Sequence, residues 1–188
     1  MKELLNIDYL YEATLSDSLS INQVNEIITL KDKFNWIGYA IVPVILLIKI
    51  GIVSAILWTG CFFFNKKISY KSLFTIVVKA EYIFLLVIIF KTTWFYFFHN
   101  NYSLEDIQYF YPLSVLNIIG YKGLEPWYIY PMQVLNLFEC VYWGLLIYML
   151  AKALNMKTDK AFNIVAGSYG AGLLIWVITI MFLTINFS

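Results

Sequence analysis

Long apolar stretches alternate with short polar connections along this chain. The apolar stretches fall at about residues 37–64, 73–98, 127–154 and 161–185. Each is long enough for a helix that crosses a hydrocarbon core of about 30 Å, which takes about 20 residues. Runs such as AIVPVILL do not alternate between apolar and polar positions, as the strands of a membrane barrel do. The pattern predicts an all-α fold, an integral membrane bundle of four transmembrane helices over residues 37–188.

Composition agrees with a membrane environment. Of the 188 residues, 61% are hydrophobic and only 13% are charged, which is more apolar than a soluble core of this size requires. The net charge is +1, and no basic face is visible outside two short connections. Nucleic acid is therefore disfavoured as a partner, because binding it needs a broad basic surface. The lipid bilayer is the expected surrounding.

Lysines predict the orientation of the spans. Connections 65–72 and 152–160 are rich in lysine, whereas connection 99–126 is mostly acidic. Because positively charged loops favour the cytoplasmic side, the two lysine-rich connections should be cytoplasmic. Four spans then place both termini on the non-cytoplasmic side of a bacterial inner membrane.

The first 36 residues form a polar, acidic segment that precedes the spans. Apolar residues recur at helical spacing over residues 4–10 and again over residues 21–28. Two short amphipathic helices on the bundle or on the membrane surface explain this spacing. An ordered tail is the alternative.

The outer connection contains a helix signal at residues 103–120. Ser103 is a good N-cap, and Glu105 and Asp106 follow in the first turn. The segment is too short to span and is interrupted by Pro112. Its many aromatic residues favour an interfacial helix, with a re-entrant element lining a pore as the alternative.

Charged residues inside the predicted spans are the main candidate site. Lys49 and Glu139 lie equally far from the outer ends of their spans, so we expect them to form an intramembrane ion pair. Lys91 is a competing cation for Glu139. Glu81 lies nearer the cytoplasmic end of the second span.

Two functions fit these charges. Glu139 and Glu81, with Lys91, Asn136 and Asn163 in a polar interior, can form a path for ions or protons. Alternatively, the charges clamp the helices in register, which balanced charges at equal depth favour. A carboxylate stranded without a cation would favour the path.

Small residues recur at four-residue spacing in the fourth span and offer a face for close helix packing. A matching face lies on the first span. The residues are Gly51, Ala55, Ala166, Gly167, Gly170 and Gly172.

Catalytic and metal-binding motifs are missing from the sequence. His99 is the single histidine, and Cys61 and Cys140 lie on different predicted spans without metal-ligand spacing. No phosphate loop or nucleophile elbow occurs. We therefore expect no enzyme activity, no metal and no cofactor.

Two segments carry a family resemblance. FFFNKKISYKSLFTIVVKAEYIFLLVI resembles the junction of two spans in Yip1-type membrane proteins, and YWGLLIYMLAKALNMKTDKAFNIVAGSYGAGLL is similar to their closing pair of spans. The resemblance covers about residues 55–180. It implies a small membrane scaffold or accessory subunit without catalytic residues.

The sequence thus favours a non-enzymatic scaffold or accessory subunit that packs with a membrane protein partner or with further copies of itself. The alternative is a transporter or channel subunit that conducts protons or cations past Glu139 and Glu81.

Overall fold

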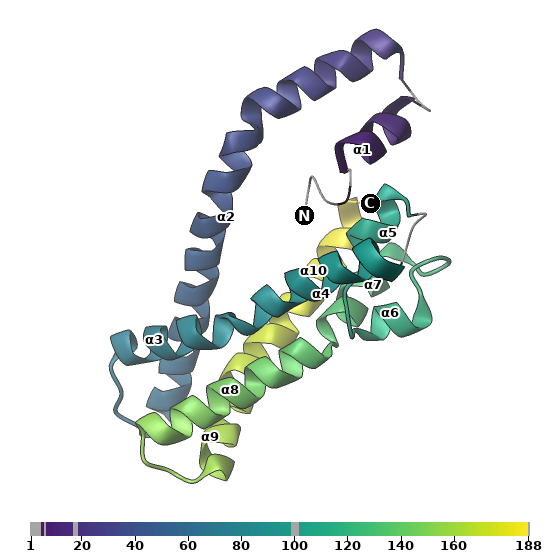
Figure 1. The fold of residues 1–188 in the computed structure, drawn as a ribbon. Coiled ribbons are helices and arrows are strands. Elements are labelled where there is room, and N and C mark those ends of the chain that lie inside the picture. Colours follow the sequence, from purple (N-terminus) through teal and green to yellow (C-terminus); the bar gives the residue numbers. More distant parts are fainter. Residues whose placement is uncertain (1–4, 6, 17–18, 99–101, 188) are drawn as a thin grey trace. The chain divides into compact units, whose positions relative to one another are not determined.

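The computed structural model describes residue 5 and residues 7–16, 19–98 and 102–187 of the chain, and these residues form helices joined by short connections (Figure 1). Within these ranges no strand occurs, apart from one isolated bridge between Ser114 and Asn136. The all-α prediction is confirmed. His99 lies outside the described residues.

Among the described residues, three helices are long and apolar enough to cross a membrane, which fits a multi-pass membrane protein: Lys33–Phe63, Tyr70–Phe98 and Thr158–Phe187. The first belongs to α2 (Ile21–Phe63). The second consists of α3 (Tyr70–Glu81) and α4 (Ile83–Phe98), with Tyr82 between them. The third consists of α9 (Thr158–Val165), the π-helix η1 (Ala166–Gly170) and α10 (Ala171–Phe187).

The predicted span at 127–154 is interrupted. It forms α7 (Pro126–Val134) and α8 (Leu137–Ala153), and neither alone has the roughly 20 residues that a crossing takes. At the break the backbone pairs with another segment, because Val115 N–H donates to Leu135 O at 2.9 Å and Leu137 N–H donates to Leu113 O at 3.1 Å. These bonds replace helical ones, so the helix cannot continue.

The chain divides into two compact units. Unit 1 comprises Met1–Leu47 and Ile88–Phe110, and unit 2 comprises Ile48–Val87 and Tyr111–Ser188. The predicted division after residue 36 differs from this one. The expected second N-terminal helix is continuous with the first span in α2, because KDKFNWIGYA contains no proline and only one glycine to end it.

In unit 1, α1 (Ile7–Ser16) packs on α5 (Leu104–Tyr109). Leu5, Phe95 of α4 and Ile107 of α5 form a small core in this unit. The capping box of α5 is present, because Ser103 Oγ accepts from Asp106 N–H and Asp106 Oδ2 accepts from Ser103 N–H.

The predicted helix at 103–120 is two short helices, α5 and α6 (Val115–Ile119). Pro112 lies between them, and its missing N–H together with its fixed φ prevents one continuous helix. Ser114 caps α6, and Gly120 ends it with a φ of +85°, a backbone conformation that glycine adopts readily.

The core of unit 2 forms where α2, α3, α8 and α9 pack together. Each helix contributes buried apolar residues at helical spacing, among them Leu57, Val77, Leu146 and Ile164. Cys61 is buried in this core, whereas Cys140 is exposed. Tyr142 and Tyr169 belong to the same core, and the Tyr169 hydroxyl donates to the polar side chain of Glu139.

Candidate functional site

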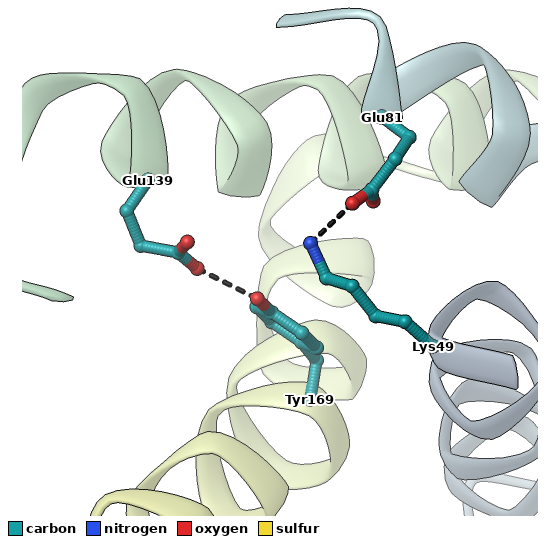
Figure 2. A network of polar contacts seen from close by, with 4 residues as sticks. All are labelled: Lys49, Glu81, Glu139 and Tyr169. Carbon is teal, nitrogen blue, oxygen red and sulfur yellow. Dashed lines mark hydrogen bonds and ion pairs between the residues drawn. The ribbon is translucent and has the colours of Figure 1, made fainter. Parts of the chain in front are cut away.

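Polar side chains from four helices meet beside the core of unit 2. Figure 2 shows Lys49 of α2, Glu81 of α3, Glu139 of α8 and Tyr169 of η1 pointing toward one another. With Tyr142, whose ring contacts that of Tyr169 at a centroid distance of 5.4 Å, they form what we call the interior cluster.

Three members of the interior cluster lie where a helix is irregular. Glu81 is the last residue of α3, directly before Tyr82, and Glu139 is in the first turn of α8, directly after the break from α7. Tyr169 lies in the π-helix η1. Irregular backbone is tolerated at membrane depth only where protein or water satisfies it, and π-helical turns are frequent at functional sites. The chain therefore concentrates its helix irregularities around these polar groups.

Lys49 forms an ion pair with Glu81. The Glu81 side chain is 7% exposed and that of Lys49 is 45% exposed. The Lys49 ammonium also lies 4.3 Å from the ring centroid of Phe84 and 5.8 Å from that of Tyr142, which are cation–π distances. Glu81 thus has a cation that aromatic faces help to hold in place.

The structure differs here from the sequence prediction, which paired Lys49 with Glu139. That prediction counted depth along straight, uninterrupted helices. The break between α7 and α8 makes such a count invalid for the third predicted span. Lys49 still attracts Glu139 electrostatically, and Glu81 repels it.

Glu139 is held by neutral hydrogen-bond donors. Its Oε1 accepts from the Tyr169 hydroxyl at 2.7 Å and from Trp143 Nε1–H at 3.0 Å. Its backbone N–H donates to Asn136 Oδ1 at 2.8 Å, which caps α8. The N-terminal end of a helix carries partial positive charge, so this position favours a carboxylate. Among the described residues, however, no cation forms an ion pair with Glu139.

Two buried oxygens of the interior cluster have unused hydrogen-bonding capacity. Within the described part of the chain, neither Glu81 Oε2 nor the Tyr142 hydroxyl makes a hydrogen bond of normal geometry, but the two groups lie close enough to interact with each other. Tyr142 is fully buried, between the rings of Phe84 and Tyr169. Buried polar groups are normally paired, so the Glu81 carboxylate is the natural acceptor for the Tyr142 hydroxyl.

The interior cluster has a surplus of negative charge. When its ionisable groups are charged, the carboxylates of Glu81 and Glu139 face the single ammonium of Lys49. This negative charge also affects Tyr111, which lies outside the candidate spans. Burial raises the pKa of Tyr111 most, and the charges of Glu139 and Glu81 add to the effect, so that the pKa is about 12. Uncompensated charge is costly in a low-dielectric interior, so a proton or a small cation is the species that this arrangement favours.

Other residues predicted for the polar interior have different places. Asn136 is buried and caps α8, where its amide also donates to Gln133 O and Val134 O. Asn163 is exposed on α9. Lys91 is half-buried on α4 in unit 1, whereas the interior cluster lies in unit 2.

Asn136→Ala is expected to destabilise unit 2 by about 0.5–2 kcal/mol, the usual effect of losing a side-chain N-cap. Asn163→Ala is the matched control, because Asn163 is exposed and caps no helix. Thermal unfolding of both variants in detergent measures the difference. Equal stability of the two variants would contradict the assigned cap.

The small-residue positions have unequal roles. A Cβ at Gly170 would lie 2.5 Å from the Trp143 ring, so this glycine leaves room for the indole that donates to Glu139. Gly172 approaches Ile56 closely. Of the remaining predicted positions, Gly51 and Gly167 have ordinary van der Waals space, Ala55 is exposed and Ala166 is half-buried.

Gly60→Ala is expected to destabilise unit 2 by about 1–3 kcal/mol through overpacking. The added Cβ would lie 2.5 Å from Ser168 Cβ, an atom that no rotamer change moves away. Gly144→Ala is the control, since nothing lies within 4 Å of its Cβ. Thermal unfolding should show a loss for the first variant only, and an equally stable Gly60→Ala variant would disprove the close approach.

Sequence reasoning missed Tyr142, Trp143 and Tyr169. The four-residue spacing of Glu139 and Trp143 on one helix was a usable signal for their hydrogen bond. Tyr169 had no such signal, because only the fold brings it to Glu139. Among the residues described, no three His, Cys, Asp or Glu side chains gather where they could hold a metal.

Comparison of this chain with protein-family models, with curated proteins and with solved structures finds no match. The resemblance to Yip1-type proteins therefore stays a prediction, and the function has to be argued from the interior cluster.

Proposed function

We propose that this chain is a non-enzymatic transporter or channel subunit of a membrane, and that Glu139 takes up and releases a proton or a small monovalent cation. One observation carries the proposal: Lys49 pairs with Glu81, which leaves Glu139 as a carboxylate without an ion-pair partner among the described residues. A helix clamp needs balanced charges, whereas a binding step needs a group that is stable in two states of charge.

The neighbours of Glu139 suit both of its charge states. When Glu139 is ionised, the Tyr169 hydroxyl and Trp143 N–H stabilise the carboxylate, and so does the N-terminal end of α8. When Glu139 is protonated, the same donors keep one oxygen bonded, and the repulsion from Glu81 disappears. Lys49 forms its ion pair with Glu81, so the exchange of charge falls to Glu139.

The four-span topology belongs to this proposal. Together α7 and α8 complete a discontinuous crossing whose break lies next to the interior cluster, which resembles the broken helices that bind ions in transporters. The lysine-rich connections then face the cytoplasm, and both termini lie on the other side of an inner membrane. In a background without the native cysteines, a single cysteine at position 67 and one at position 122 should be labelled from opposite sides of the membrane.

Purified protein in lipid vesicles tests the proposal. With a pH-sensitive dye inside, a proton gradient should collapse faster through vesicles that contain the protein than through empty ones, and parallel assays with Na⁺ and K⁺ identify the ion. Absence of flux for all three ions, from protein shown to be folded, would contradict the proposal.

An accessory subunit is the second candidate, and exposed apolar residues of α6 favour it. Ile118 is 85% exposed and Ile119 is 58% exposed, in the connection expected on the outer side. Such residues insert into lipid or contact a membrane protein partner or another copy of the chain. Mild-detergent purification from the native membrane should then recover a partner at constant stoichiometry.

A further inference from the structure

The connection between α2 and α3 contains a pocket, separate from the interior cluster. The pocket has a volume of about 420 Å³. One part of its lining is apolar and the other carries cations and a hydroxyl: Trp58, Phe62 and Ile68 against Lys66, Lys67 and Ser69.

The pocket lies at an end of two candidate spans. Lys33–Phe63 and Tyr70–Phe98 are both long and apolar enough to cross a membrane, and only residues 64–69 join them. If both helices cross, this connection must lie at a membrane surface. The pocket then opens at the depth of lipid headgroups, where phosphate groups and the first acyl carbons meet.

Hydrogen bonds at both ends of the connection fix Lys66 and Lys67 beside the pocket. Asn65 adopts a left-handed conformation with a φ of 53°, and Lys66 N–H donates to Cys61 O at 2.8 Å, so α2 ends in a closed turn. On the other side Ser69 Oγ accepts from Ser72 N–H at 3.2 Å and caps α3. Both ends of the connection are therefore held by hydrogen bonds.

The charge of this connection is unbalanced. Within the described residues, neither Lys66 nor Lys67 has a carboxylate partner. Trp58 is 49% exposed and Phe62 is 70% exposed beside them. An anion that also carries an apolar chain fits both parts of this lining, whereas a bare anion uses only one.

We propose that this pocket binds an anionic phospholipid in the leaflet that faces the connection. Lys66 and Lys67 would neutralise the phosphate, the Ser69 hydroxyl would donate to it, and the apolar side chains Trp58 and Phe62 would contact the start of an acyl chain. Basic pockets beside the cytoplasmic ends of spans bind lipid headgroups in this way. The proposal does not depend on proton or cation flux.

Native mass spectrometry of the full chain in detergent tests it, with phosphatidylglycerol and phosphatidylcholine of the same acyl chains as probes. The wild type should bind phosphatidylglycerol at least about 10-fold more tightly than phosphatidylcholine. The Lys66→Gln/Lys67→Gln variant should lose this preference. The control Lys152→Gln/Lys157→Gln makes the same change in net charge in the other lysine-rich connection and should keep it.

A charge-conserving variant, Lys66→Arg/Lys67→Arg, separates binding from folding and should keep the preference. Equal loss in the control variant, or equal binding of both lipids by the wild type, would overturn the proposal. Displacement of phosphatidylglycerol by inorganic phosphate at an equal concentration would overturn it too, since the pocket would then be a site for free anions.

Discussion

The Glu139→Gln variant is expected to lose proton or cation flux completely, to the level of vesicles without protein, while unit 2 stays folded. Glutamine has nearly the same shape, and its Oε1 can still accept from the Tyr169 hydroxyl and from Trp143 N–H. It cannot be ionised. The free energy of unfolding should therefore change by no more than about 1 kcal/mol.

Glu125→Gln is the matched control for this variant. Glu125 is exposed at the start of α7, and its side chain makes no capping hydrogen bond there. Flux should persist in this control. A folded Glu139→Gln variant with normal flux would refute the role of Glu139, and a variant that unfolds would show that this carboxylate serves as a clamp.

Lys49→Met is expected to have a large effect on stability. Methionine keeps an unbranched side chain but removes the cation from Glu81, whose carboxylate is 7% exposed. The loss should be about 1–3 kcal/mol, the usual penalty for a buried group left without its partner. Breaking a fully buried ion pair costs about 3–5 kcal/mol, and the 45% exposure of Lys49 places this pair below that range.

Adding Glu81→Gln should restore part of the stability that Lys49→Met loses, because the stranded charge is removed. A double-mutant cycle, measured by unfolding in lipid or detergent, gives the coupling energy of the two residues. Lys79→Met is the control, since Lys79 is exposed. Strictly additive effects would contradict the pair. Rescue by Glu139→Gln in place of Glu81→Gln would favour the pairing that the sequence predicted.

Hydropathy was sufficient to predict the helical class and three helices that are long and apolar enough to cross a membrane. Apolar runs at 37–64, 73–98 and 161–185 correspond to helices that are long enough to span. Hydropathy could not show that residues 127–154 form two helices, because the break depends on backbone bonds to residues 113–115. Such bonds between distant segments leave no periodic signal in the sequence.

The candidate site was predictable in its residue types but not in its pairing. Lys49, Glu81 and Glu139 were identified because charges are rare inside apolar spans. Their pairing depends on the end of α3 and on the start of α8, and neither irregularity follows from composition. Tyr169 reaches Glu139 from a π-helical turn, so no count of residues along an α-helix could place it.

Infrared difference spectroscopy of the protein in lipid, recorded as the pH is changed, tests the central claim most directly. A protonated carboxyl group has its own C=O stretching band. For exchange of a proton, the account predicts such a band in the wild type and in Glu81→Gln, and its loss in Glu139→Gln. An unchanged band in Glu139→Gln would show that another group exchanges the proton, and a wild type without the band would show that Glu139 never binds one.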